Sequence, residues 1–326
     1  MKKYKPKLNI IDTQRAIKLV KDSFENKLAD VLNLVRVSAP LFVTQGSGLN
    51  DDLNGHEKPV SFTVNGINDT ITIVQSLAKW KRYALKKYGF PTHSGLYADM
   101  NAIRRDEVVD NIHSIYVDQW DWEAIINKED RNLAFLERIV RKIYRCIKEV
   151  QKLTIQAYPC LTDFLSEDIY FITSEELLQM YPSLTPKERE YEITKKYGSV
   201  FIEQIGCELS DGNKHDGRAP DYDDWELNGD ILVYYPPLDQ AIELSSMGIR
   251  VSPESLAKQL EISNKTERKS LPFHKELLSG NLPYTIGGGI GQSRLCLIML
   301  NKIHIGEVQS SLWNGSIDDE ISPYIL

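Results

Sequence analysis

Hydrophobic side chains recur every three or four residues in two long stretches of the chain, a spacing that predicts amphipathic helices. The first stretch covers residues 12–34 and begins with Asp12 and Thr13, either of which is a suitable N-cap. The second covers residues 131–153. Shorter helices are predicted to begin at two capping boxes, residues 173–176 and 185–188.

Polar and apolar residues alternate with period two in other stretches, which predicts strands. Residues 35–43 fit a strand that Pro40 interrupts, and residues 60–64 and 70–74 fit a hairpin. Further strands are predicted near the C-terminus, at residues 200–205, 231–235 and 241–246. Because we find no internal repeat or Ser/Pro-rich linker, we expect one domain over residues 1–326.

The alternation is clearest at residues 115–122. Gln119 and Asp121 fall on one face of this predicted strand, and Trp120 and Trp122 fall on the other. A strand with this pattern packs one face against the hydrophobic core and presents polar side chains, suited to binding a ligand, on the other.

A glycine-rich stretch, residues 285–295, joins a predicted strand to a helix. Its glycines, at positions 287, 288, 289 and 291, let a phosphate or a flat ligand lie directly on the backbone. Arg294 follows in the first helical turn, where its planar guanidinium and the helix N-terminus both favour an anion. The stretch lacks the context of a dinucleotide fingerprint and the Lys-Ser/Thr of a P-loop. Taken alone, it is also compatible with an ordinary turn.

The composition of this 326-residue chain restricts its expected cellular location and its expected binding partners. Its formal net charge is −7. No apolar run approaches the roughly 20 residues of a membrane span, and no apolar segment follows the basic N-terminus as it would in a signal peptide. Its four cysteines have no Cys-x-x-Cys spacing, which argues against a zinc site or a disulfide framework. We therefore expect a soluble, cytoplasmic protein, and the acidic balance disfavours a tRNA partner.

Two charged clusters suggest binding chemistry. Lys79, Lys81 and Arg82 surround Trp80, and they form either a solvated helix face or a site for a carboxylate or phosphate. A polar loop and the strand start after it contain six aspartates, at positions 211, 216, 221, 223, 224 and 230. Such loops are commonly just solvated. Another polar loop, residues 46–57, fits either a lid or a solvated connection.

Three stretches, in chain order, resemble the signature motifs of class II aminoacyl-tRNA synthetases. The helix at residues 12–34 and the Pro40 strand resemble the first motif, which forms the dimer interface in that class. Residues 95–123 resemble the second motif, a strand-loop-strand element. Arg104 is in the place of its arginine at the end of the first strand, which in that class contacts the ATP α-phosphate. The Gly-x-Gly-x-Gly-x-x-Arg-Leu pattern ending at Leu295 resembles the third, which binds ATP.

Because the chain is expected to bind ATP, two carboxylates are candidate ligands for a metal ion. We expect Asp230 at the start of one strand and Glu243 inside the next. Carboxylate oxygens on neighbouring strands suit Mg²⁺ held between protein and triphosphate. Glu243 also lies in an apolar strand, where a lone buried carboxylate is costly unless it is paired or bound to metal.

Residues 117–123 and 243–251 narrow the resemblance to bacterial ammonia-dependent asparagine synthetases, the aspartate–ammonia ligase family. This likeness extends from Asp12 to the C-terminus. It implies an α+β fold with a class II synthetase-like antiparallel sheet flanked by helices, and a homodimer. It also implies that aspartate, ATP and ammonia give asparagine, AMP and pyrophosphate through a β-aspartyl-adenylate.

The resemblance further implies roles for individual residues. The implied catalytic residues are Arg104, Gln119, Asp121 and Arg294, with Asp121 as a hypothetical proton acceptor for ammonia. The implied aspartate-binding residues are Asp51, Lys81, Arg82, Ser245, Ser246 and Arg250. The implied ATP-binding residues are Arg104, Ser114, Asp223, Gly287, Gly289, Gly291 and Arg294. The implied Mg²⁺ ligands are Asp230 and Glu243.

Three alternatives are weighed against this interpretation. Aspartyl- and asparaginyl-tRNA synthetases carry an anticodon-binding barrel before the first motif, whereas here that motif begins near Asp12. A catalytically silent paralogue is disfavoured because Arg104 and Arg294 are retained with both carboxylates. A glutamine-dependent synthetase is disfavoured because no cysteine stands at the N-terminus.

Overall fold

The computed structural model describes residues 4–51, 53, 57–313 and 317–326, so part of the predicted loop at 46–57 lies outside the described residues. In this part of the chain, the main sheet has eight strands. Their order is β1 (Leu34–Arg36), β5 (Gly95–Ile103), β6 (Tyr116–Ile125), β11 (Thr285–Gly291), β10 (Gln240–Arg250), β9 (Asp223–Tyr235), β8 (Ser199–Glu203) and β7 (Tyr170–Thr173). The six inner strands pair antiparallel, as predicted, and the two edge strands pair in parallel.

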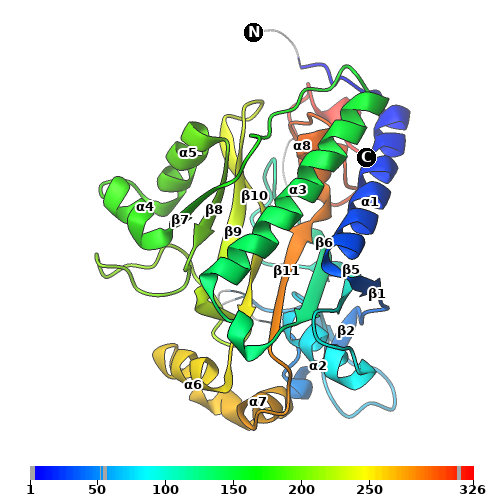
Figure 1. Ribbon diagram of the computed structural model, residues 1–326. Coiled ribbons are helices and arrows are strands. Elements are labelled where there is room, and N and C mark those ends of the chain that lie inside the picture. The colour runs from blue at the N-terminus through cyan, green and yellow to red at the C-terminus, as the bar shows by residue number, and fades with distance from the viewer. Residues whose placement is uncertain (1–3, 52, 54–56, 314–316) are drawn as a thin grey trace.

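One face of the sheet is covered by the long helices α1 (Ile10–Leu32) and α3 (Leu133–Ala157), which lie side by side in Figure 1, and by α8 (Gln292–Met299). The main hydrophobic core lies between these helices and the sheet. Trp120 and Trp122 are fully buried in this core, and the Trp120 ring packs against Phe24 with 4.7 Å between ring centroids. The predicted core face of this strand is therefore confirmed.

Smaller elements surround the sheet. The remaining helices described are α2 (Ala78–Tyr88), α4 (Ser174–Met180), α5 (Pro186–Tyr197), α6 (Pro253–Ile262) and α7 (Pro272–Leu278). Of these, α2 packs against β6 and α5 packs against β9 and β10. A second sheet consists of β2 (Phe42–Thr44), β4 (Ile71–Ile73) and β3 (Ser61–Phe62). Short 3₁₀ helices are η1 (Gln45–Ser47), η2 (Lys128–Asp130), η3 (Thr266–Ser270), η4 (Ile305–Glu307) and η5 (Ser322–Tyr324). Among the described helices, none is both long and apolar enough to span a bilayer.

Both predicted capping boxes are present, at the starts of α4 and α5. The cap predicted for the first helix is wrong, because α1 begins earlier and Asn9 accepts a hydrogen bond from the Asp12 amide. The predicted strand around Pro40 is divided between two sheets, as β1 and β2.

The predicted start of β9 is also wrong, because the strand begins at Asp223 and Asp230 lies well inside it. From sequence alone, the acidic residues before Asp230 suggested a loop, because the basic residue that pairs with Asp223 was not known. Asp223 pairs in register with Arg250 of β10, and this opposite charge permits an acidic residue in a buried strand.

Glu203, at the end of β8, provides a prediction about pH and stability. It is buried, and its Oε1 has no hydrogen-bond partner among the described residues. Burial, with Glu137 and Glu176 nearby, raises the pKa of Glu203 to about 7. Because the folded pKa exceeds the unfolded value, stability is lost as the pH rises from about 4.5 to about 7.

Glu203→Gln should therefore stabilise the protein by about 1–3 kcal/mol near pH 8 and have little effect near pH 4. Urea unfolding at both pH values measures this difference. The exposed Glu208, changed to Gln, is the control and should alter neither value. An equal gain at both pH values would contradict a proton-linked cause.

Candidate active site

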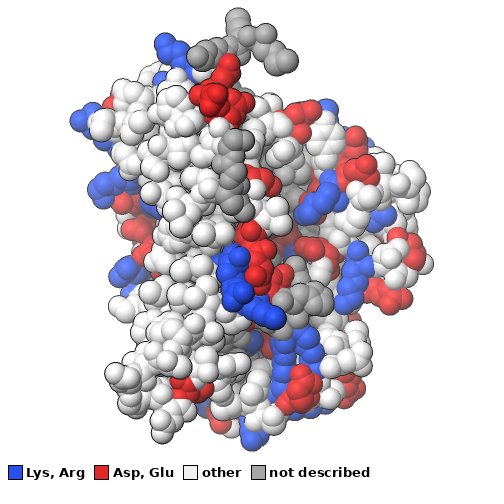
Figure 2. Space-filling model, turned by 180° about the vertical axis from the view of Figure 1, so that it is seen from behind, with Lys and Arg blue, Asp and Glu red and all other residues white. Residues whose placement is uncertain are grey.

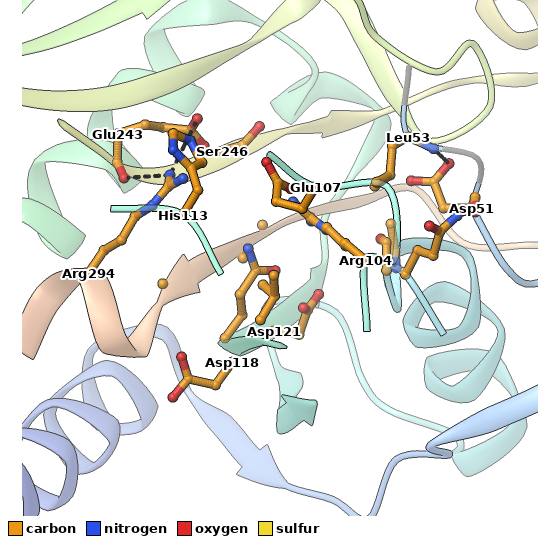
Figure 3. A pocket seen from close by; sticks show the side chains of 18 of the residues that line it. Asp51, Leu53, Arg104, Glu107, His113, Asp118, Asp121, Glu243, Ser246 and Arg294 are labelled. Atoms are coloured by element: carbon orange, nitrogen blue, oxygen red, sulfur yellow. Dashed lines mark hydrogen bonds and ion pairs between the residues drawn. The ribbon is translucent and has the colours of Figure 1, made fainter. Parts of the chain in front are cut away.

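A cavity of about 430 Å³ opens on the face of the sheet opposite α1 and α3. Its walls come from the loop between β5 and β6, from β6, β10 and β11, from the first turn of α8, and from residues 216–223 (Figure 3). Figure 2 shows acidic and basic side chains gathered near the middle of this side of the molecule. The cavity is thus polar and contains charges of both signs.

Two arginines from distant segments line this cavity, Arg294 at the left of the view in Figure 3 and Arg104 nearer its centre. Arg104 directly follows β5, and its buried Nε has no hydrogen-bond partner in the described part of the chain. Arg294 lies in the first turn of α8, where its Nη1 donates to the Glu243 carbonyl oxygen at 3.1 Å. The unsatisfied Nε of Arg104 can donate a hydrogen bond to a ligand, and both guanidinium groups are cationic, so the cavity suits an anionic ligand.

The polar face of β6 forms a row of charges with its neighbours. Lys81 of α2 makes an ion pair with Asp121 and donates to the Gly288 carbonyl oxygen at 3.2 Å. Burial lowers the pKa of Lys81, and the carboxylate of Asp121 opposes this effect. The cations around Trp80 are therefore buried, which decides against a solvated helix face.

Arg250 lies next in this row, between two carboxylates. Its Nη2 donates to Glu123 Oε2 at 2.8 Å and its Nε to the same carboxylate at 3.0 Å. Its Nη1 makes an ion pair with Asp223. Since a guanidinium has five N–H donors, two remain for a further acceptor in the cavity.

Glycine is required at two positions of β11 because atoms of the neighbouring strand β6 occupy the space that a Cβ would need. An added Cβ at Gly287 would lie 2.3 Å from Glu123 Oε2 and 2.6 Å from the Trp122 carbonyl oxygen. At Gly289 it would lie 2.5 Å from Gln119 Oε1. The glycine pattern thus makes room for the polar row as well as for a ligand.

Substituting alanine at these two glycines should have different effects. Gly289→Ala meets only the movable end of Gln119, so we expect displacement of that amide and about a tenfold loss of kcat/KM, equivalent to about 1.4 kcal/mol. Gly287→Ala meets backbone and a fixed carboxylate, so we expect destabilisation of about 1–3 kcal/mol. Thermal unfolding and steady-state kinetics of both variants separate the two effects. Equal changes in Tm would contradict this distinction.

The structure brings most of the predicted site residues to the cavity. Those that line it are Asp51, Lys81, Arg104, Ser114, Gln119, Asp121, Asp223, Glu243, Ser246, Arg250, Gly289, Gly291 and Arg294. Four others are not among the residues that line it: Arg82, Asp230, Ser245 and Gly287. Arg82 donates to the carbonyl oxygens of Val251 and Pro283, and Ser245 donates to that of Gly289 at 2.9 Å.

The two predicted metal ligands have different surroundings. Asp230 makes an ion pair with Arg218, while its buried Oδ1 has no partner within the described ranges. Burial and the nearby Glu243 raise the pKa of Asp230 to about 7, against the effect of Arg218. The Glu243 side chain is 39% exposed, so the expectation of a buried lone carboxylate is wrong. The described residues contain no group of three or more His, Cys, Asp or Glu side chains that could hold a metal ion.

Several cavity residues were given no role from the sequence: Glu107, His113, Asp118, Asp216, Arg218 and Tyr222. Except for Asp118 of β6, they lie in the two polar connections, residues 104–115 and 209–222, where neither alternation nor helical spacing identifies an inward face.

An antiparallel sheet with one arginine after a strand and another in a glycine-rich strand-to-helix turn defines a class II aminoacyl-tRNA synthetase-like fold. The structure is similar to asparaginyl-tRNA synthetase from Pyrococcus horikoshii complexed with asparaginyl-adenylate. The TM-score is 0.67 at 14% identity, over 90% of this chain and 67% of that one. A likeness at this identity establishes the fold alone, and it confirms the predicted class.

The sequence comparisons identify the family within this class. The family model for aspartate-ammonia ligase matches residues 11–323. The aspartate–ammonia ligase of Clostridium perfringens (strain SM101) is 62% identical over 96% of this chain and 94% of its own. That of Lactiplantibacillus plantarum is 56% identical over 96% and 98%. The chain therefore belongs to the aspartate–ammonia ligase family, and the tRNA synthetase alternative is not favoured.

Proposed function

We propose that this ligase joins ammonia to the β-carboxylate of aspartate in the cavity described above. ATP activates the carboxylate, and asparagine, AMP and pyrophosphate are released. The observation that best supports this is the presence of Arg104 and Arg294 in one cavity with the charged row around Lys81. Anions and an amino acid can therefore be bound side by side.

The first chemical step forms β-aspartyl-adenylate. A carboxylate oxygen attacks the α-phosphate of ATP, the bond to the β-phosphate breaks, and pyrophosphate leaves. Negative charge develops at the α-phosphate, and preorganised donors that stabilise it are usually the largest catalytic term. Arg104, with its unsatisfied Nε, would contact this phosphate, and Arg294 would bind the terminal phosphates. Ser114, Asp223, Gly289 and Gly291 would line the nucleotide.

Aspartate would bind between opposite charges. Asp51 would accept its ammonium group, while Lys81 and Arg250 would bind its carboxylates, with Gln119 and Ser246 alongside. Arg82 and Ser245 would act from behind the wall, since their hydrogen bonds go to backbone carbonyl oxygens.

In the second step ammonia attacks the adenylate carbonyl and AMP leaves. Ammonia must react as NH₃, so a carboxylate that accepts a proton assists this step, and Asp121 is suitably placed. Asp121→Asn should therefore slow asparagine formation about 10²-fold while slowing ATP–pyrophosphate exchange much less. Rapid-quench measurement of both steps tests this, and an equal loss in both would remove Asp121 from the proton transfer.

Mg²⁺ would be held by Asp230 and Glu243 together with phosphate oxygens. The unpartnered Oδ1 of Asp230 and the repulsion between the two carboxylates fit a divalent cation. The metal would neutralise phosphate charge. Asp230→Asn should raise the Mg²⁺ concentration that gives half-maximal activity. If this concentration does not change, Asp230 is not a ligand of the metal.

We also propose a homodimer, built on α1 and the strands after it. Large apolar side chains are exposed there: Ile10, Ile11, Val31, Val35, Leu41 and Phe42. Light scattering at several concentrations measures the mass. The chain would act as one catalytic domain, since the residues of its main core extend from Leu8 to Val308. Its cysteines are free, which fits a reducing compartment such as the cytoplasm.

The reaction itself is tested with purified protein, ATP, Mg²⁺, aspartate and ammonium, with and without tRNA. Asparagine and AMP should appear in equal amounts without tRNA. Aminoacylation of tRNA would favour a synthetase, and absence of both products would favour a catalytically silent protein.

A further inference from the structure

Asp118 of β6 has a role that the proposed mechanism does not use. Its side chain is only 7% exposed, and three donors surround it. Oδ1 accepts the backbone N–H of Ser293 at 3.1 Å and Nε2 of Gln309 at 3.3 Å. Oδ2 accepts from Lys21 Nζ of α1 at 2.9 Å. A buried carboxylate with this many partners holds separate elements in one arrangement.

The element that most depends on Asp118 is α8. The residue at its N-cap is Gly291, which has no side chain to satisfy the first amides of the helix. Asp118 supplies the missing acceptor from another strand, and its negative charge suits the helix N-terminus. Ser293, which it binds, directly precedes Arg294. The position of this arginine's backbone is therefore fixed by Asp118.

Lys21 supplies the opposite charge beside this buried carboxylate. Burying Asp118 without a cation would be costly, and the ammonium of Lys21 compensates its charge from α1. Gln309 adds a second connection, because its Nε2 also donates to Ser293 Oγ at 3.0 Å. The long helix on one face of the sheet is thus linked to the cavity on the other face.

We propose that Asp118 and Lys21 are positioning residues for Arg294, and that they set how tightly the nucleotide triphosphate is held. The inference rests on the proposed function of the cavity. Asp118 borders the cavity, but its two oxygens are already bound by Ser293, Gln309 and Lys21. Neither Asp118 nor Lys21 therefore needs to contact the substrate, because both act through the first turn of α8.

Asp118→Asn and Lys21→Met should raise KM for ATP about tenfold, the size expected when a charge-assisted hydrogen bond is lost, and leave KM for aspartate within about twofold. Lys21→Arg should restore most of the ATP affinity. Lys27→Met is the matched control, because Lys27 lies on the same helix and pairs with Glu149 of α3 at 2.7 Å, away from α8. It should leave both KM values unchanged.

A double-mutant cycle distinguishes positioning from general destabilisation. In an Arg294→Ala background, Asp118→Asn should change KM for ATP less than about twofold, because its effect is exerted through that arginine. Full additivity, or equal increases of KM for both substrates, would overturn the inference. Calorimetric binding of a non-hydrolysable ATP analogue gives a readout without turnover. Inactive wild-type protein would refute the proposed function, while the analogue would still test the role of Asp118.

Discussion

Replacing Arg250 with methionine should destabilise the protein by about 3–5 kcal/mol, because the change leaves two buried carboxylates without their cation. Arg250 binds Glu123 through two nitrogens and Asp223 through a third, and all three side chains are almost fully buried. The loss therefore consists mainly of uncompensated burial of Glu123 and Asp223. Urea unfolding followed by circular dichroism measures it.

Two further variants test this cause. Lys258→Met removes an exposed ion pair with Glu226 and should cost no more than about 1 kcal/mol. Adding Glu123→Gln to Arg250→Met should recover part of the lost stability, since one of the stranded charges disappears. If Arg250→Met behaves like Lys258→Met, the buried charged row does not stabilise the fold. If the double variant is less stable still, packing and not charge is the cause.

Local patterns in the sequence were sufficient to predict much of this fold. The helical stripes, the capping boxes and the two faces of β6 depend on residues close in the chain, so period and composition reveal them. The glycine-rich turn with Arg294, and Arg104 at a strand end, are local for the same reason. These features sufficed to indicate the class.

Long-range pairing could not be predicted in this way. The start of β9 depends on Asp223 meeting Arg250, which is 27 residues away. Asp230 stays a predicted Mg²⁺ ligand, but its ion pair with Arg218 was not predicted. Arg82 was assigned to the substrate with Lys81, yet its neighbours in space are carbonyl oxygens of residues 251 and 283. In each case the deciding partner is distant in the chain.

Removing either of the cavity arginines should give the largest loss of activity. Arg104→Ala and Arg294→Ala should each lower kcat/KM for adenylate formation by about 10²–10³-fold, the effect of losing one preorganised donor to a developing charge. Stability should change little, because Arg104 has an unpartnered Nε among the described residues and Arg294 remains partly exposed. ATP–pyrophosphate exchange measures the first step without requiring ammonia.

Arg105 provides the matched control for this pair. It is adjacent to Arg104, 52% exposed, and pairs only loosely with Asp106 at 3.4 Å between Nε and Oδ1. Arg105→Ala should therefore keep nearly full exchange activity. Because both cavity arginines would hold the same nucleotide, the double variant should lose less than the product of the two single losses. If the losses of kcat/KM in the double variant multiply fully, the two guanidinium groups do not bind one ATP molecule. The same conclusion follows if Arg105→Ala loses as much activity as Arg104→Ala.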